Sequence, residues 1–325
     1  MGYHRVYCIE SIEKGEYFTG FFNTMLFSLI SLMVCLAAGF IGRLTRILGD
    51  GAISAMTDIL LNISLPCTIF IAMVRPFSAS LFRDSMFVLG VFTVIQLAGY
   101  VFGIITVKLL RADPNVKRVW IFAIMFSNVG YMGYPVITAV LGDSALIYAS
   151  MVNMSFNILA YSLGMRLIDP NRGSAKFDWR RIFLTPVMIA TVIGLIFFVT
   201  SISLPEPVTN GVKYIADMTT PVSMLLLGAI LGKSDFRGLF AGWKVYAVLL
   251  VKHFIIPLAV LAVLKPLIHN HMALSVIVLL CAMPAASVTA IFAQKYNSGA
   301  EQAARIVFIS TVLSLVTVPI ISLFL

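Results

Sequence analysis

Two stretches of the sequence place small and polar residues beside a proline inside long apolar runs. One is "FSNVGYMGYPV" at 126–136, and the other is "CAMPAASVTA" at 281–290. A proline removes a backbone donor and frees a carbonyl, and neighbouring glycines allow the chain to unwind. Each stretch therefore predicts an interrupted helix. A half-helix that starts after Pro135 or Pro284 would present unpaired N–H groups and the positive end of a dipole, a geometry that suits an anion.

The candidate substrate-binding residues come from these two stretches. Asn128 donates and accepts hydrogen bonds, Ser127 does either, and the glycines permit close approach of a ligand. The set is Ser127, Asn128, Gly130, Tyr131, Gly133, Pro135, Pro284, Ala285, Ser287 and Thr289. Asparagine and serine also join transmembrane helices, so interhelical hydrogen bonding is the alternative for Asn128. For Tyr131 and Tyr134, cavity lining and ordinary packing both stay open.

Ionisable residues at membrane depth are a second group of candidates, because a charge at a helix centre costs on the order of 3 kcal/mol. "VLLVKHFIIPL" at 248–258 places Lys252 and His253 within an apolar run, shortly before Pro257. We expect Lys252 to act as a gating cation, a proton-linked group or a counter-charge. The residues expected to support or couple transport are Asn62, Ser64, Pro66, Asp217, Thr220, Pro221, Lys252 and His253. The polar residues beside Pro66 and Pro221 also suit helix-to-helix hydrogen bonds.

The composition of the chain is that of a polytopic membrane protein. Of its 325 residues, 60% are hydrophobic and 11% are charged, and a soluble domain does not bury so much apolar surface. Apolar runs of about 20 residues, the length that crosses a bilayer, recur from end to end. They predict an all-α protein with ten transmembrane helices at 21–42, 53–74, 86–107, 119–141, 144–167, 183–203, 212–231, 240–264, 272–294 and 303–325.

The charge distribution orients the chain rather than indicating nucleic acid. The chain has 23 Lys and Arg against 14 Asp and Glu, and most of the basic residues fall in the odd-numbered connections. By the positive-inside rule these connections are cytoplasmic and both termini are extracytoplasmic. The four cysteines lack metal-ligand spacing, and "HNH" at 269–271 is typical of a solvated loop. We therefore predict no metal site and no cofactor.

The positions of the prolines indicate that the two halves of the sequence are an internal repeat. "NISLP" ends at Pro66 and "DMTTP" at Pro221, and the prolines of the fourth and ninth spans repeat at a similar offset. An odd number of spans per copy inverts the second copy, an arrangement typical of secondary transporters with midplane sites. The alternative is coincidence, since proline is common in transmembrane helices. The expected organisation is an extramembrane segment at 1–20, five-helix repeats at 21–167 and 183–325, and a cytoplasmic linker at 168–182.

Several stretches, in order, resemble the auxin efflux carrier family of membrane transporters. They are "LLNISLPCTIFIAM", "FSNVGYMGYPVI", "LTPVMIATVIGLIFF", "TTPVSMLLLGAILG" and "AMPAASVTAIFAQKYNSGAEQAARIVFISTVLSL". Asn128 and Pro135 match the fourth-helix motif of that family, and Pro284 matches the break in its ninth helix. The central loop is short and the Asn-Pro-Asn sequence of the plant exporters is missing. The resemblance is therefore nearer to the bacterial carriers of malonate or malate than to auxin exporters.

The resemblance implies a fold and a mechanism. The fold has two inverted five-helix repeats whose broken fourth and ninth helices cross at the substrate site. A scaffold of helices 1, 2, 6 and 7 carries a moving domain of helices 3–5 and 8–10, and dimers form through the scaffold. We expect the protein to lie in the bacterial inner membrane.

The sequence thus predicts a secondary active or facilitative transporter of a small organic anion, such as malonate, malate or an auxin-like acid, with elevator-type alternating access. Coupling to protons or to sodium stays open. A sodium symporter of the bile-acid type is the alternative, although the crossing segments carry no carboxylate. From other classes, a non-transporting membrane sensor stays possible. An intramembrane protease using Asp58 and Asp217 is disfavoured, because the Gly-x-Gly-Asp sequence of that class is missing, and no enzyme activity is expected.

Overall fold

The structure is a computed structural model that describes residues 30–169, 183–233 and 242–325. The segment at 1–20 and nearly all of the linker at 168–182 lie outside the described residues. Within them, every regular element is helical, and the β-type pairing is confined to one isolated bridge. The all-helical class is confirmed.

Helices occupy each of the ten predicted spans where these are described. The first span holds a helix over Ile30–Leu44. The elements that follow in the first half are α2 (Asp50–Ile59), η1 (Leu60–Ser64), α3 (Leu65–Met73), α4 (Ala79–Leu109), α5 (Pro114–Met125), η2 (Val129–Gly133), α6 (Tyr134–Leu141), η3 (Asp143–Ala145), α7 (Leu146–Leu159), η4 (Ala160–Gly164) and α8 (Met165–Ile168). Those of the second half are α10 (Pro186–Thr200), α11 (Glu206–Asp217), α12 (Thr219–Lys233), α13 (Trp243–Leu250), η5 (Val251–Ile255), α14 (Ile256–Leu264), α15 (His271–Ala282), α16 (Val288–Lys295) and α17 (Ala300–Ser322).

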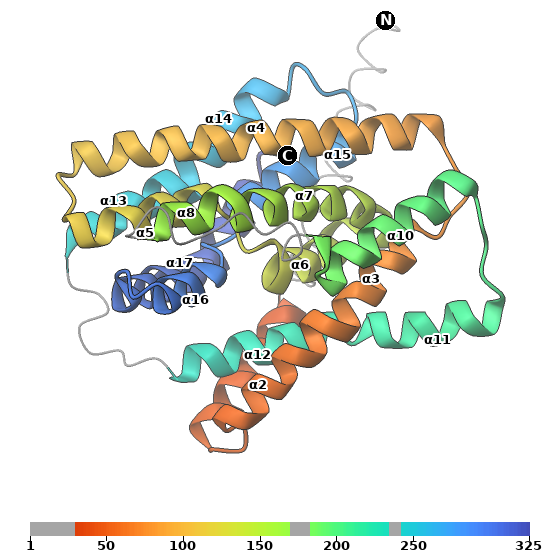
Figure 1. The fold of residues 1–325 in the computed structure, drawn as a ribbon, viewed down its shortest axis with the longest axis horizontal. Coiled ribbons are helices and arrows are strands. Elements are labelled where there is room, and N and C mark those ends of the chain that lie inside the picture. The colour runs from red at the N-terminus through yellow and green to blue at the C-terminus, as the bar shows by residue number, and fades with distance from the viewer. Residues whose placement is uncertain (1–29, 170–182, 234–241) are drawn as a thin grey trace, which may run out of the picture.

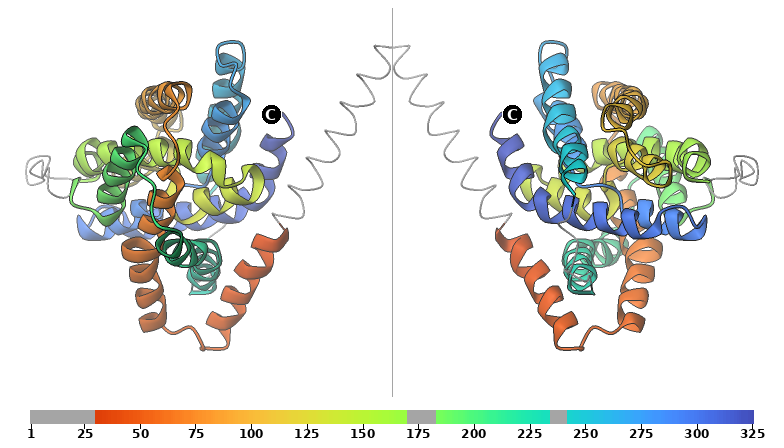
Figure 2. Two further views of the ribbon diagram at one scale, coloured as in Figure 1. Left: turned by 90° about the vertical axis from the view of Figure 1, so that its right-hand side faces the viewer. Right: turned by 90° about the vertical axis from the view of Figure 1, so that its left-hand side faces the viewer.

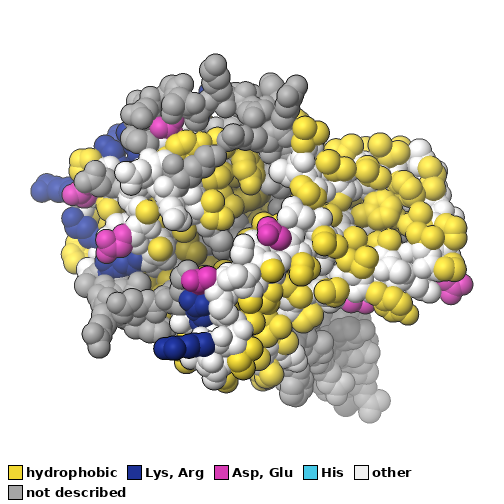
Figure 3. Space-filling model, turned by 60° about the horizontal axis from the view of Figure 1, so that its bottom comes forward, with side chains coloured by type: hydrophobic (Ala, Val, Ile, Leu, Met, Phe, Trp, Pro, Cys, Tyr) yellow, Lys and Arg dark blue, Asp and Glu magenta, His cyan; other side chains and the backbone are white. Residues whose placement is uncertain are grey.

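Several of these helices are long and apolar enough to cross a bilayer. In the described part of the chain there are six, at Asp50–Met73, Ala79–Leu109, Asp143–Ile168, Glu206–Gly232, Trp243–Leu264 and Ala300–Ser322. Shorter apolar helices occupy the other spans. On the face shown in Figure 3, hydrophobic side chains cover much of the surface and the Lys and Arg side chains gather at one end. An integral, multi-pass membrane protein follows from these features.

Three prolines inside the spans follow turns of π-helix. η1, η2 and η5 each end two residues before a proline, at Pro66, Pro135 and Pro257, and each proline lies in the first turn of the next α-helix. A proline ring clashes with the carbonyl four residues earlier and supplies no N–H, so a wider turn before it relieves both problems. The helix is therefore continuous through each of these three prolines.

The true interruptions lie elsewhere in two spans. α5 ends at Met125 and the helix restarts at Val129, so Pro135 lies well inside the second half-helix and not at its start. The expectation of a half-helix that begins after Pro135 is wrong, because proline is tolerated in a first turn and Asn128 begins the half-helix instead. In the ninth span, α15 ends at Ala282 and α16 starts at Val288, so Pro284 does lie in the interruption.

The helices form two packed groups (Figures 1 and 2). One contains Ile30–Leu44, α2, α3 and α10 to α12, with α3 against α10 and α11 and α12 against α2. The other contains α4 to α8 and α13 to α17, with α4 against α5 and α7 and α17 against α5, α15 and α16. α7 meets α3 and α10 across the boundary, and α12 meets η2 and α6. Whether the two halves of the sequence are related by a two-fold axis stays a prediction.

Backbones approach very closely within the first group. A Cβ added to Gly228 of α12 would lie 1.9 Å from the Leu36 carbonyl oxygen, and one added to Gly39 would lie 2.0 Å from the Leu225 carbonyl oxygen. A Cβ added to Gly232, four residues after Gly228, would lie 3.0 Å from the Arg43 side chain and 3.1 Å from the Phe40 carbonyl oxygen. This glycine spacing is typical of transmembrane helices that touch backbone to backbone.

Candidate functional site

The two interruptions pair with each other through their backbones. The Asn128 N–H donates to the Pro284 carbonyl oxygen (2.8 Å), and the Ala286 N–H donates to the Phe126 carbonyl oxygen (3.1 Å). These bonds flank an antiparallel bridge between Ser127 and Ala285. Each interruption thus supplies the partners that the other has lost, as the bilayer requires of non-helical backbone. We call residues 126–128 and 283–287 together the junction.

Asn128 ties the junction together with its side chain. Its Oδ1 accepts a hydrogen bond from the Tyr131 N–H (3.1 Å), which caps the new half-helix. Its Nδ2 donates to the Ser287 hydroxyl oxygen (3.2 Å) on the other interruption. The two predicted residues therefore contact each other directly, although their numbers lie far apart in the sequence.

A cavity of about 140 Å³ lies beside the junction. Its lining combines the start of both half-helices with α3, α7, η4 and α10. The residues are Leu61, Leu65, Asn128, Val129, Gly130, Tyr131, Asn153, Phe156, Asn157, Tyr161, Val187, Ala286, Ser287, Val288, Ile291 and Phe292. Among these described residues no side chain is ionisable except tyrosine. We call this space the junction cavity.

Sequence reasoning missed the polar wall that α7 and η4 contribute to this cavity. Asn153, Asn157 and Tyr161 all line it, and Asn157 Nδ2 donates to the Asn153 carbonyl oxygen (2.9 Å). Residues spaced by four fall on one face of a helix. That spacing of three polar residues, in an otherwise apolar span, was a signal available in the sequence.

The other predicted substrate residues lie beside the cavity but do not line it. Pro135, Pro284 and Ala285 are buried in packing. Gly133 is packed so closely that an added Cβ would lie 2.7 Å from a Leu280 methyl carbon. Thr289 is fully buried, and its hydroxyl has no hydrogen-bond partner among the described residues. Four of the ten candidates, Asn128, Gly130, Tyr131 and Ser287, therefore line the junction cavity.

Lys252 and His253 lie against the junction without lining this cavity. The Lys252 ammonium donates to the Ser127 hydroxyl oxygen (2.5 Å) and to the Cys281 carbonyl oxygen (3.4 Å). Ser127 donates its own hydroxyl hydrogen to the same carbonyl (3.3 Å). Ser127 is thus joined to Lys252 rather than turned to the cavity.

Comparison with known proteins decides the family. The sequence model of a family described as a membrane transport protein matches residues 24–322, nearly the whole chain. The chain belongs to this family, that of the auxin efflux carriers. The predicted resemblance is confirmed, and the protein is a membrane transporter by family.

Three curated relatives are all named as transporters, and one of the three names includes a substrate. An uncharacterized transporter of Methanothermobacter thermautotrophicus is 26% identical over 297 residues, covering 90% of this chain and 96% of the relative. A putative malonate transporter of Rhizobium meliloti is 25% identical over 291 residues, covering 86% and 90%. The uncharacterized transporter YfdV of Escherichia coli is 22% identical over 300 residues, covering 90% and 95%.

A second, larger cavity of about 370 Å³ lies one helical turn from the first along the same helices of the transporter. Leu65 and Tyr131 line the junction cavity, whereas Thr68 and Tyr134 line the larger one. Thr68 donates or accepts a 2.7 Å hydrogen bond with Thr219. The lining of the larger cavity includes Arg75, Asp143, Lys213, Asp217 and Thr220. This cavity is therefore charged where the junction cavity is not.

Two of the other predicted supporting residues line this larger cavity, and the rest do not. Asp217 and Thr220 line the cavity. Ser64 is buried, and its hydroxyl has no partner in the described part of the chain, whereas Asn62 and Pro221 are exposed and Pro66 is half-buried. Asp58 does not line either cavity with Asp217, which gives no support to a carboxylate pair.

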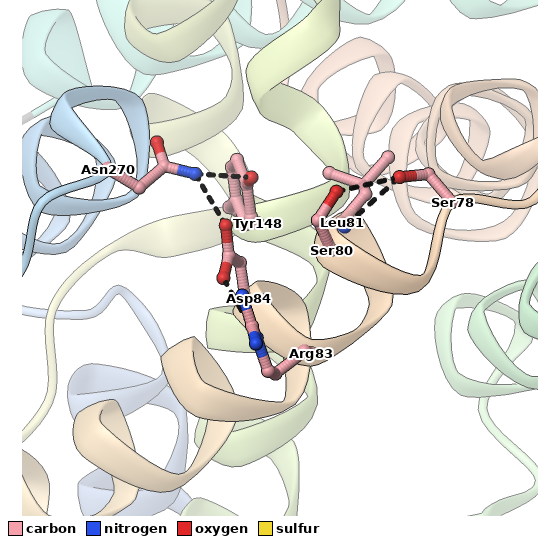
Figure 4. A network of polar contacts seen from close by, with 7 residues as sticks. All are labelled: Ser78, Ser80, Leu81, Arg83, Asp84, Tyr148 and Asn270. Carbon is pink, nitrogen blue, oxygen red and sulfur yellow. Dashed lines mark hydrogen bonds and ion pairs between the residues drawn. The ribbon is translucent and has the colours of Figure 1, made fainter.

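A polar network holds the starts of α4 and α15 against α7 (Figure 4). Asn270 Nδ2 donates to Asp84 Oδ2 (2.7 Å) and to the Tyr148 hydroxyl oxygen (3.0 Å). Asn270 Oδ1 accepts from the Ala273 N–H (3.2 Å), which caps α15. One amide therefore joins three helices of the second group.

We expect Asn270→Ala to lower the free energy of unfolding by about 2 kcal/mol, because it removes a helix cap and a hydrogen bond to a carboxylate. Thermal unfolding of the purified transporter in detergent would measure the loss. Ser80→Ala is the control, since that exposed hydroxyl bonds only to the Ser78 hydroxyl among the described residues. Equal melting temperatures for the two variants would contradict the role of Asn270.

Proposed function

We propose that the protein is a secondary transporter of a small organic anion, which binds in the junction cavity with its carboxylate toward Asn128 and Ser287. One observation carries the proposal. Two half-helices, η2 with α6 and α16, begin at the wall of a cavity that contains no carboxylate among its described lining residues. Helix starts carry positive partial charge, which favours an anion in a site of low dielectric constant.

The cavity also restricts the size and shape of the substrate. Its volume of about 140 Å³ is small, which suits an acid of a few carbon atoms. Asn153, Asn157 and Tyr161 provide donors away from the junction, and Leu65 and Phe292 provide apolar contact. A malonate-like or malate-like acid meets both requirements. The name of the Rhizobium relative supports this choice.

The proposed mechanism is alternating access of the elevator type. The junction cavity has walls from both helix groups, with α3 and α10 on one side and the junction with α7 on the other. The larger cavity lies one turn further along α3 and α6. A shift of the second group against the first would carry the junction from one cavity region toward the other, as expected for a pair of inverted five-helix repeats at 21–167 and 183–325.

Placement in the membrane follows the charge distribution. The end that gathers Lys and Arg in Figure 3 would face the cytoplasm of a bacterial cell. Both termini would then be extracytoplasmic, and homodimers would form through the first helix group as the family resemblance implies.

Flux measurement tests the function. Purified protein in liposomes would be challenged with malonate, malate and small monocarboxylates on a solid-supported membrane, with and without sodium and with a pH step. We expect currents or exchange for at least one of these acids. Protein that folds but moves none of them, by current or by radiolabel exchange, would show that the substrate is not a small carboxylate.

A further inference from the structure

A buried cation lies against the junction without a carboxylate partner in the described part of the chain. The Lys252 side chain is part of η5, the π-turn that precedes Pro257, and the residue is 2% exposed. Among the described residues, no carboxylate lies within 4.0 Å of its ammonium group. A lone buried charge is costly, so other groups must compensate it.

The compensating groups are the carboxyl ends of two half-helices. The ammonium contacts the carbonyl oxygen of Cys281, in the last turn of α15, and the hydroxyl of Ser127, which follows the end of α5. The last carbonyls of a helix have no intrahelical partner and carry partial negative charge. The junction therefore has two electrically different sides. The starts of η2 and α16 meet the cavity, and the ends of α5 and α15 meet Lys252.

The neighbouring His253 holds the other interruption. His253 Nε2 lies 2.8 Å from the Ser310 hydroxyl oxygen, and its Nδ1 lies 3.0 Å from the Thr317 hydroxyl oxygen. Ser310 accepts a hydrogen bond from the Ala285 N–H (2.8 Å). Two adjacent residues of one π-turn thus contact residues 126–128 directly and residues 283–287 through Ser310.

We propose that the Lys252 ammonium is a tethered cation that fills the place of a small monovalent ion at the ends of α5 and α15. A hydroxyl and a carbonyl oxygen are the ligands that an inorganic or ammonium ion takes in an interrupted helix. Because the chain itself supplies this cation, the paired interruptions of the junction need no bound sodium for their stability. The consequence for transport rests on the proposed function, whereas the consequence for stability does not.

Removing the side chain should leave a place that a free ion can occupy. Lys252→Ala would be compared with wild type by thermal unfolding in nanodiscs, at equal ionic strength, in N-methylglucamine, sodium or ammonium chloride. We expect the variant to melt lower than wild type in N-methylglucamine chloride and to gain about 2 °C or more in ammonium or sodium chloride. The wild-type melting temperature should be the same in all three salts.

A matched variant separates charge from volume. Lys252→Met fills the same space without a charge, so it should be destabilised and should not respond to the ions. Equal melting temperatures for folded Lys252→Ala in the three salts would overturn the proposal. If neither variant folds, wild type still decides, because a rise of its melting temperature specific to sodium or ammonium would show that the ion site is elsewhere.

Transport gives the second measurement. Wild-type flux of malonate should not change when N-methylglucamine replaces sodium on both sides, and a flux that needs sodium would contradict a tethered cation. If no carboxylate is transported at all, the proposed function fails while the melting temperatures still test Lys252. The two failures are therefore distinguishable.

Discussion

We expect Asn128→Asp to abolish transport of the proposed organic anion while keeping the cap of the half-helix that starts at Val129. Aspartate caps a helix as well as asparagine does, so the bond from the Tyr131 N–H (3.1 Å) survives. The new carboxylate lies on the wall of a cavity without a cation among its described lining residues. It would repel the substrate carboxylate in a site of low dielectric constant, where like charges interact strongly. We expect the initial rate of carboxylate uptake to fall by at least about 100-fold, a change of roughly 3 kcal/mol.

Asn128→Ala makes the complementary measurement. It removes the cap and the bond to Ser287 but adds no charge, so stability should fall by about 1 kcal/mol. Uptake should fall by about tenfold or more, as expected for loss of one hydrogen bond to a charged group. Uptake by Asn128→Asp that matches wild type would place the substrate elsewhere. If uptake by a variant falls only because less of the protein is folded, Asn128 has a purely structural role.

Much of the fold was predictable because the bilayer restricts it. Apolar length and polar punctuation depend on local composition, and the described helices overlap the predicted spans. The interruptions were harder to place. Pro135 lies in the first turn of α6, whereas the helix is interrupted before Asn128, whose side chain replaces a lost backbone partner.

The sequence predicted where the candidate site lies, but it predicted only some of the residues that line it. Asn128 and Ser287 were found because each accompanies a small-residue stretch, and the structure brings them together. Asn153 and Asn157 were missed because the prediction relied on prolines, which mark interrupted helices. The helix α7 is continuous through both residues. The contact of Lys252 with Ser127 and Cys281 depends on tertiary packing between spans, which no spacing along the chain encodes.

The contact of α12 with the Ile30–Leu44 helix should be the most sensitive packing site among the described helices. Gly228→Ala would place a methyl group 1.9 Å from the Leu36 carbonyl oxygen and 2.8 Å from the Phe40 nitrogen. Both neighbours are backbone atoms, so a rotamer change cannot relieve the clash and the helices must separate. Overpacking of this kind costs about 1–3 kcal/mol, and we expect the upper part of that range. Thermal unfolding in detergent would measure it.

Controls for this prediction come from the same chain. Gly211→Ala in α11 meets nothing within 4 Å, so it should be neutral or slightly stabilising, because alanine favours a helix more than glycine does. Gly39→Ala should resemble Gly228→Ala, since its methyl group would lie 2.0 Å from the Leu225 carbonyl oxygen. Once one methyl group has separated the two helices, the second has less to displace. The double variant should therefore lose clearly less stability than the two single losses added together, and simple additivity would mean that the glycines do not share one contact.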